Sequence, residues 1–125
     1  MGAKITIDCA TLMNKGLELI EAHHLFDTPM DKLEVLVHRQ SRIHSMVEFV
    51  DGSVKAQLGA SDMRLPIQFA LSYPHRWPAI AKPVKWQETT PLTGDYADEK
   101  TFGCLALARH AGTVGGTLPC IMNAA

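Results

Sequence analysis

Residues 46–58 read Met-Val-Glu-Phe-Val-Asp-Gly-Ser-Val-Lys-Ala-Gln-Leu, and this stretch decides the class of the fold. Two runs with strand-forming residues, 46–50 and 54–58, flank the pair Asp51-Gly52. An Asp-Gly pair in this setting is the strongest short-range signal for a β-hairpin, because glycine tolerates the positive φ of a tight turn. The stretch therefore predicts two neighbouring antiparallel strands.

Helical patterns lie on both sides of the predicted hairpin. Before it, Thr11 is expected to cap a helix that runs to about Phe26. After it, Asp62 is expected to cap a helix over 63–71, which ends before a proline. These segments place helices and strands in separate runs, which is typical of an α+β fold.

The remaining segments give weaker signals. Two short strands are expected, at 4–7 and 33–38. From Tyr73 to Glu99 four prolines interrupt any regular pattern, so this part is predicted to be an extended arm. Helical spacing resumes over 102–111, with Gly112 as the expected stop, and we expect this helix to have no partner in the chain.

The predicted fold class is therefore α+β. We expect a small mixed or antiparallel sheet with helices packed on it, followed by an extended arm and one helix. The expected domain division is a partial catalytic domain at 1–75, a connecting arm at 76–100 and the start of a helical domain at 101–125.

Composition narrows the classes of partner. The chain has 125 residues, of which 46% are hydrophobic and 20% charged, and its formal net charge is −1. With no dense Lys/Arg run, this charge argues against a nucleic-acid partner or an acidic membrane surface. The odd set of three cysteines favours a reducing compartment. No apolar stretch approaches the roughly 20 residues that cross a bilayer, so we expect a cytoplasmic protein.

The most informative polar residues are Asn14, Lys15 and Glu18. At helical spacing of three and four residues they can share one face, where an amide, an ammonium and a carboxylate suit a phosphate and a metal ion. The simpler interpretation is a solvated ion pair that contributes a few tenths of a kcal/mol. Gly16 argues against it, because a glycine inside a helix costs about 0.5–1 kcal/mol and suggests a close approach.

A longer series of short sequence segments resembles one protein family. The chain is similar to 1-deoxy-D-xylulose 5-phosphate (DXP) reductoisomerase, densely over 1–75 and more loosely beyond. Its last residues, 123–125, resemble the start of an Asn-Ala-Ala-Asn-Glu motif, so we expect an internal piece of a longer enzyme. The segments that carry the resemblance are 4–8, 10–18, 40–41, 43–49, 51–54, 56–59 and 62–67.

The resemblance implies roles for individual residues. Asn14 and Lys15 match ligands of the substrate phosphate, and Glu18 matches a metal-binding carboxylate. The implied cofactors are NADPH and a divalent cation, Mg or Mn. The full implied set is Glu18, Lys15 and His44 as catalytic residues, Cys9, Asn14, Lys15, Glu18, Ser41 and Met63 as substrate-binding residues, Met1 and Gly2 as cofactor-binding residues, and Glu18 as the metal ligand.

Several of these residues also have simpler interpretations, and some positions depart from the family. A methionine is more often a core residue than a nicotinamide contact, and a lone histidine is more often structural. Cys9 stands where the family has a serine, and a thiol is the weaker donor. Arg39 and Ser61 replace prolines, and the second change is expected to loosen a loop. Arg42 replaces an aliphatic residue, so its guanidinium must reach water or disturb the fold.

Two functions are therefore considered. The first is a fragment of an NADPH- and metal-dependent enzyme that converts DXP to 2-C-methyl-D-erythritol 4-phosphate in the non-mevalonate isoprenoid pathway. We expect its parent to be a homodimer, with a plastid location open if the parent is from a plant or alga, and the isolated chain to have no turnover. The alternative is a non-catalytic truncated homologue that acts as a self-association or binding module through the predicted hairpin.

Overall fold

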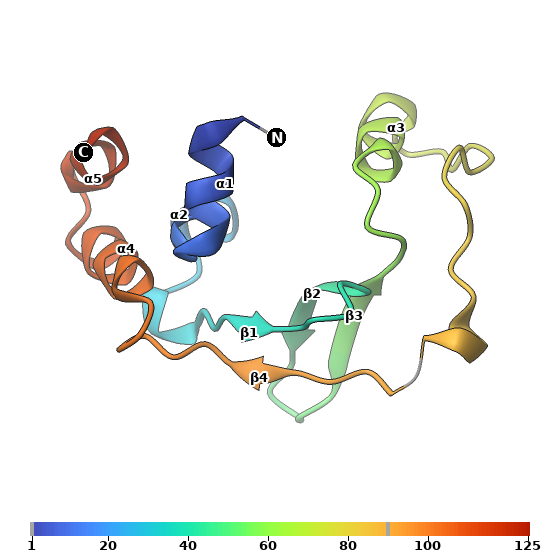
Figure 1. Cartoon of the computed structure of the whole chain (residues 1–125), viewed down its shortest axis with the longest axis horizontal. Helices are drawn as coiled ribbons and strands as arrows, with labels where there is room; N and C mark the ends of the chain where they lie inside the picture. Colours follow the sequence, from blue (N-terminus) through green and yellow to red (C-terminus); the bar gives the residue numbers. More distant parts are fainter. Residues whose placement is uncertain (1, 90) are drawn as a thin grey trace. The chain divides into compact units, whose positions relative to one another are not determined.

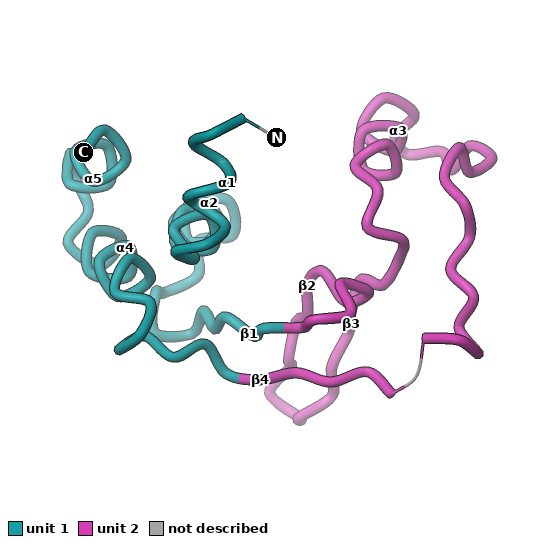
Figure 2. The backbone as a smooth tube through the Cα atoms, in the orientation of Figure 1, with its two compact units in different colours: residues 1–37, 96–125 teal, residues 38–95 magenta. Residues whose placement is uncertain are grey.

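The computed structural model describes residues 2–89 and 91–125 and divides the chain into two compact units (Figures 1 and 2). Unit 1 combines two separate segments, Met1–Val37 and Tyr96–Ala125, and unit 2 is the continuous segment His38–Asp95. Figure 2 colours unit 1 teal and unit 2 magenta. The polypeptide thus leaves unit 1, forms unit 2 and returns.

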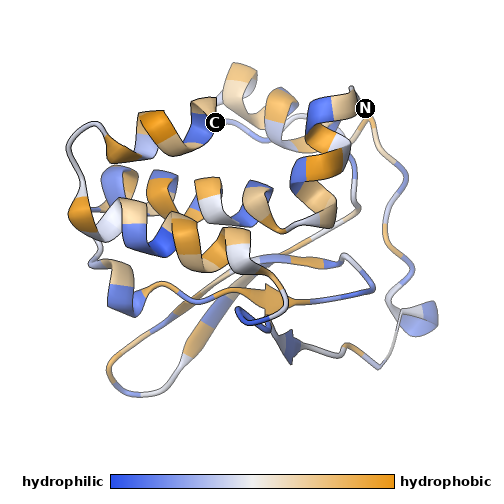
Figure 3. Cartoon of the chain, turned by 60° about the vertical axis from the view of Figure 1, so that its left-hand side comes forward, coloured by the Kyte–Doolittle hydropathy of each residue, from blue (hydrophilic) through white to orange (hydrophobic). Residues whose placement is uncertain are grey.

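Unit 1 is mainly helical. Its helices are α1 (Ala3–Ala10), α2 (Met13–Phe26), α4 (Gly103–Val114) and α5 (Leu118–Ala124). It also contains the 3-10 helix η1 (Met30–Lys32) and the short strand β1 (Leu36–Val37). Orange and blue residues interleave along these helices in Figure 3, as expected when one side of each helix meets a core and the other meets water.

The core of unit 1 lies where α2 packs on α4. Leu105 and Ala108 of α4 are completely buried, and Leu19 and Ile20 of α2 pack with them. Gly16 lets the two helices approach, because a Cβ there would lie 2.4 Å from the Cβ of Ala108. The glycine that suggested a close approach to a ligand therefore serves helix–helix packing.

A side chain on α4 fastens the turn that follows α2. One guanidinium nitrogen of Arg109 donates to the carbonyl oxygens of Met30 (2.8 Å) and Leu33 (2.9 Å). Its Nε atom donates to Glu99 Oε1 at 3.1 Å. Because buried or half-buried carbonyls need donors, Arg109 satisfies two of them at once and holds η1 against α4.

Unit 2 contains the predicted hairpin, β2 (Ile43–Glu48) with β3 (Val54–Leu58), the helix α3 (Arg64–Ser72) and the 3-10 helix η2 (Trp86–Glu88). The strands are antiparallel, with Glu48 opposite Val54 and Met46 opposite Ala56. At the turn Gly52 has φ +80, as the Asp-Gly signal requires. A last short strand, β4 (Asp95–Tyr96), pairs with β1.

The α+β class is confirmed, but several local predictions are wrong. Residues 4–7 belong to α1 and not to a strand, and only Leu36–Val37 of the strand expected at 33–38 is formed. The expected stop Gly112 is buried inside α4, and Gly115 with φ +74 follows the helix instead. A further helix, α5, was not expected.

The helix after the arm also has the partner that it was predicted to lack, because α4 packs on α2. Helices from the two ends of the chain therefore share one compact unit. The described helices of unit 1 pack on one another, and β2 and β3 pair with each other. The expected division at 1–75, 76–100 and 101–125 does not coincide with these units, and as a statement about domains of a longer protein it stays a prediction.

Candidate functional site

The polar cluster on the first turns of α2 has the geometry that its spacing predicts. Asn14 Nδ2 donates to Glu18 Oε1 at 2.8 Å. Lys15 Nζ lies 2.9 Å from Glu18 Oε1 and 2.8 Å from Oε2. Three short contacts thus converge on one carboxylate. The Lys15 and Glu18 side chains are 48% and 47% exposed, so the cluster is open to a ligand.

The junction between α1 and α2 sets the direction of this cluster. Leu12 has φ +58, a left-handed conformation that is uncommon for leucine, and it is the N-cap of α2 directly after Thr11, the C-cap of α1. Thr11 Oγ1 donates to Ile7 O at 2.9 Å and accepts from Met13 N at 3.4 Å. Thr11 therefore supports α2 as expected, although the capping position itself is Leu12.

The other expected ligands in unit 1 are less constrained. Cys9 is an exposed residue of α1. Gly2 precedes α1, and its carbonyl oxygen accepts the amide of Thr6 at 3.2 Å. Met1, which was expected to contact the cofactor, lies outside the described residues.

Unit 2 holds the remaining expected residues. Ser41 lies in the turn after β1 with φ +50, and its carbonyl oxygen accepts a hydrogen bond from Ser61 Oγ. Ser61, which replaces a proline and was expected to loosen this loop, therefore donates a hydrogen bond that a proline could not make. Met63 precedes α3 and is 72% exposed, so it is not a core residue.

His44, expected to be a catalytic residue, lies in strand β2. Its Nδ1 atom lies 3.1 Å from Oε1 of Gln57, on the opposite strand. This contact ties the His44 ring to strand β3 through Nδ1.

The expected residues thus fall into two groups. Cys9, Asn14, Lys15 and Glu18 belong to unit 1, and only the last three contact one another. Ser41, His44 and Met63 belong to unit 2. Each unit therefore presents its own part of the expected set.

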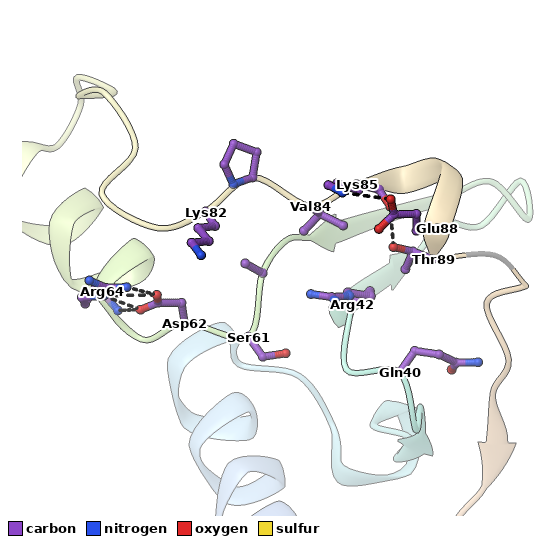
Figure 4. Close-up of a pocket in the computed structure, with 12 residues that line it drawn as sticks. Gln40, Arg42, Ser61, Asp62, Arg64, Lys82, Val84, Lys85, Glu88 and Thr89 are labelled. Carbon is purple, nitrogen blue, oxygen red and sulfur yellow. Dashed lines mark hydrogen bonds and ion pairs between the residues drawn. The ribbon is translucent and has the colours of Figure 1, made fainter.

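A pocket of about 660 Å³ in unit 2 was not predicted from the sequence (Figure 4). Arg42, Arg64, Lys82 and Lys85 line it together with two carboxylates. Arg42 is partly buried, and its guanidinium faces this pocket instead of disturbing the fold. The only signal in the sequence was a few separated basic residues, two of them in the arm, which are normally solvated.

One carboxylate of this pocket has a strongly shifted pKa. The Arg64 side chain donates to Asp62 with Nε at 3.0 Å from Oδ1, and the Arg64 amide donates to the same oxygen at 3.0 Å. These bonds lower the pKa of Asp62 from 3.8 to about 2. Asp62 is therefore ionised at all pH values near neutrality.

Metal binding needs more ligands than these residues provide. Among residues 2–89 and 91–125, no group of three His, Cys, Asp or Glu side chains is arranged to hold a metal ion. Glu18 is a single hard oxygen ligand, and a divalent cation of the Mg type needs several. The described residues do not form a metal centre by themselves.

No helix in the described part of the chain is long and apolar enough to span a bilayer.

Comparison with known families decides the relationship. The profile described as "DXP reductoisomerase C-terminal domain" matches residues 58–125, more than half of the chain. The profile described as "1-deoxy-D-xylulose 5-phosphate reductoisomerase C-terminal domain" matches residues 1–26. The chain belongs to the DXP reductoisomerase family.

Individual members of the DXP reductoisomerase family match the whole chain. The reductoisomerases of Symbiobacterium thermophilum and Clostridium acetobutylicum are 57% and 58% identical to it over 125 residues, and that of Bacillus subtilis is 56% identical over 126 residues. The match covers 100% of this chain but only 32% or 33% of each relative. The chain thus spans about a third of the length of these curated relatives.

Solved structures of the family share the fold. The reductoisomerase of Zymomonas mobilis in complex with NADPH matches 98% of this chain and 32% of its own, with a TM-score of 0.93 and 49% identity. A reductoisomerase in complex with NADPH, fosmidomycin and magnesium matches 98% of this chain and 30% of its own, with a TM-score of 0.94 and 47% identity.

Proposed function

We propose that this chain is the part of a DXP reductoisomerase that binds the substrate phosphate and contributes one metal ligand. The parent reaction would convert DXP to 2-C-methyl-D-erythritol 4-phosphate with NADPH and Mg or Mn. The observation that carries the proposal is the convergence of Asn14 and Lys15 on Glu18 at the exposed start of α2. Family membership and the solved relatives with NADPH and magnesium support it.

The cluster suits a phosphorylated substrate for a simple chemical reason. Lys15 supplies a positive charge and Asn14 an amide donor, and both can turn from Glu18 to phosphate oxygens. Glu18 then regains free lone pairs. In this proposal the arriving phosphate releases the carboxylate that serves as a metal ligand, so that the two events favour each other.

The cofactors need residues beyond those described. Glu18 would supply only one ligand to the cation, which would act as a Lewis acid on substrate oxygens when bound. Gly2 is proposed to lie beside the nicotinamide, as the resemblance implies, but it offers only backbone groups. NADPH must therefore be held mainly by parts of the parent outside this sequence.

Residues of unit 2 are proposed to complete the substrate site. Ser41 and Met63 are exposed, which leaves the hydroxyl and the thioether free to contact a ligand. His44 is proposed to orient substrate through Nε2, since Nδ1 is engaged by Gln57. Cys9 is proposed to replace the family's serine as a weaker donor to the phosphate.

A chimera tests this function. The matching third of the Bacillus subtilis reductoisomerase is replaced by this chain, and NADPH oxidation is followed with DXP and Mn. We expect turnover that requires both. Lys15→Met should lower kcat/KM by about tenfold to a hundredfold, the loss expected for one charged hydrogen bond to a phosphate. Lys100→Met, the same charge change at an exposed site in unit 1, should leave the rate unchanged.

Two outcomes would contradict the proposal. One is a folded chimera without activity, with folding checked by circular dichroism. The other is an active chimera in which Lys15→Met and Lys100→Met behave alike. The isolated chain, assayed in the same way, should show no turnover because it offers one metal ligand.

The parent is proposed to be a homodimer that uses the hairpin of unit 2. Within the described residues β2 and β3 pair only with each other, and Met46, Val47 and Val54 are 44%, 57% and 54% exposed. Val54→Asp should lower the sedimentation coefficient of an associated form, whereas Ser53→Asp in the adjacent turn should not. Equal association of both variants would rule out this surface.

A cytoplasmic location is also proposed, supported by three free cysteines.

A further inference from the structure

The pocket of unit 2 is formed by residues from three parts of the segment 38–95. Arg42 directly precedes β2, Ser61, Asp62 and Arg64 come from the loop and first residue of α3, and Lys82 and Lys85 come from the arm. Its volume of about 660 Å³ lies in the range of pockets that hold small organic ligands. It shares no residue with the α2 cluster and stands independently of the proposed function.

The two acidic residues of the pocket are already engaged. Asp62 Oδ2 lies 2.6 Å from a guanidinium nitrogen of Arg64, and Glu88 Oε1 lies 2.9 Å from Lys85 Nζ. Each carboxylate therefore neutralises the cation of its own segment. Of the four cationic side chains that line the pocket, Arg42 and Lys82 have no carboxylate partner among the described residues.

These two residues point their charged ends into the same space (Figure 4). Among the described residues neither side chain has an ion-pair or hydrogen-bond partner, whereas the other two cations of the pocket have one. Arg42 is in addition partly buried. A partly buried guanidinium without an anion is unfavourable, and an anionic ligand would remove that cost.

The neutral side-chain donors around the pocket already donate hydrogen bonds to other groups of the chain. Ser61 Oγ donates to Ser41 O, and Thr89 Oγ1 donates to Lys85 O at 2.8 Å. Gln40 Nε2 donates to Pro91 O at 3.1 Å and Thr93 Oγ1 at 2.9 Å. Arg42 and Lys82 are therefore the lining side chains whose donors are all unengaged, and their positive charge favours an anion over a neutral sugar.

We propose that this pocket binds a phosphate group of a small molecule between Arg42 and Lys82. The planar guanidinium can donate two parallel hydrogen bonds to a phosphate, and the ammonium adds a point charge from the opposite side. The pocket has room for more than the phosphate alone. The group is either inorganic, as in pyrophosphate, or the ester of a sugar.

Nuclear magnetic resonance of the ¹⁵N-labelled full chain tests this inference, with inorganic pyrophosphate and ribose 5-phosphate as separate probes. We expect saturable shifts of the amides of Gln40, Ser61 and Val84 with at least one probe. The tighter probe identifies whether the inorganic or the esterified phosphate is preferred. The absence of shifts at these amides with both probes would overturn the proposal.

Variants that remove the same charge distinguish a specific binding site from non-specific electrostatic attraction of the anion. Lys82→Met, on an exposed side chain, and Arg42→Met should each weaken binding by about tenfold, as expected for a charged hydrogen bond. Arg42→Lys keeps the charge and should weaken binding less. Lys100→Met in unit 1 should have no effect. If Lys100→Met weakens binding as much as Lys82→Met, only an adventitious ion is bound and the inference fails.

The same spectra keep this site apart from the proposed substrate site. Shifts confined to Asn14 and Lys15, abolished by Lys15→Met, would support the proposed function and refute the pocket. Shifts at Ser61 and Val84 that survive Lys15→Met but not Lys82→Met would support the pocket alone. Each proposal can therefore fail without the other.

Discussion

Gly16 of α2 and Ala108 of α4 face each other with no room for a further methyl group, since a Cβ on Gly16 would lie 2.4 Å from the Ala108 Cβ. Contacts between carbon atoms are normally near 3.5–4 Å, so the Ala108 methyl group packs directly against the backbone of α2 at Gly16. Gly16 lies between Lys15 and Glu18 in the sequence, so the polar cluster occupies the same turns of α2 as the packed helix interface. The site and the core are thus built on the same helix.

Gly16→Ala should destabilise the chain. Alanine favours a helix by about 0.5–1 kcal/mol over glycine, but the clash with Ala108 should cost about 1–3 kcal/mol and dominate. The free energy of unfolding in urea measures the difference. Gly103→Ala is the matched control, because a Cβ there meets nothing within 4 Å. The double variant Gly16→Ala with Ala108→Gly should recover stability, and no recovery would refute the steric account.

Gly112→Ala should be milder, although that glycine is also buried in α4. Its added Cβ would lie 2.7 Å from the terminal methyl of Met30 and 3.2 Å from Cγ1 of Ile20. A methionine end can move at little cost, so the net change in unfolding free energy should stay within about 1 kcal/mol. A loss larger than that of Gly16→Ala would show that Met30 is fixed.

Arg109→Met should lower the unfolding free energy by about 1–3 kcal/mol, because it leaves the carbonyls of Met30 and Leu33 without their charged donor. Glu99→Gln removes only the partly exposed ion pair and should cost less than about 1 kcal/mol. Chemical denaturation of both variants makes the comparison. Equal losses would mean that the ion pair matters more than the carbonyl contacts.

The Asp62 carboxyl should titrate near pH 2, below its ordinary value of 3.8. Since its pKa is lowered in the folded chain, the contact with Arg64 is fully present above about pH 4 and is lost as the pH falls through about 2. Carboxyl carbon shifts followed against pH by nuclear magnetic resonance report it. Arg64→Met should return the midpoint toward 3.8, and an unchanged midpoint would assign the shift to another cause.

Cys9→Ser should improve substrate binding in the chimera. A hydroxyl donates more strongly than a thiol, so KM for DXP should fall by up to about tenfold if Cys9 faces the phosphate. Cys120→Ser, at another exposed cysteine, is the control and should leave KM unchanged. A KM unaffected by Cys9→Ser would remove this residue from the phosphate site.

Local signals predicted the structure where they were strong. Asp51-Gly52 predicted the hairpin, because few other sequences fit its turn, and the spacing of Lys15 and Glu18 predicted their contact. The run Ile5-Thr6-Ile7 suggested a strand from its β-branched residues. The structure has α1 there, with Lys4 Nζ 2.7 Å from Asp8 Oδ2 one turn on, a pairing that the spacing could have revealed.

Signals that depend on distant partners could not be interpreted from the sequence. The helix α5 was not predicted, although Pro119 lies in its first turn, where a proline removes no hydrogen bond. Gly16 and Gly112 suggested a ligand contact and a helix end because Ala108 and Met30 were not visible as neighbours. The convergence of Arg42 and Lys82 likewise depends on how the arm returns to the hairpin.

Because unit 1 consists of two separate chain segments, it cannot complete its folding during synthesis until the second segment has been made. Unit 2 is continuous, so its strands and α3 have all their partners once residue 95 has left the ribosome. Leu19 and Ile20 on α2 must wait for Leu105 and Ala108, which are made much later. During that interval the apolar side of α2 is exposed to chaperones and to other nascent chains. The helix that closes the hydrophobic core of unit 1 is therefore synthesised only after unit 2 is complete.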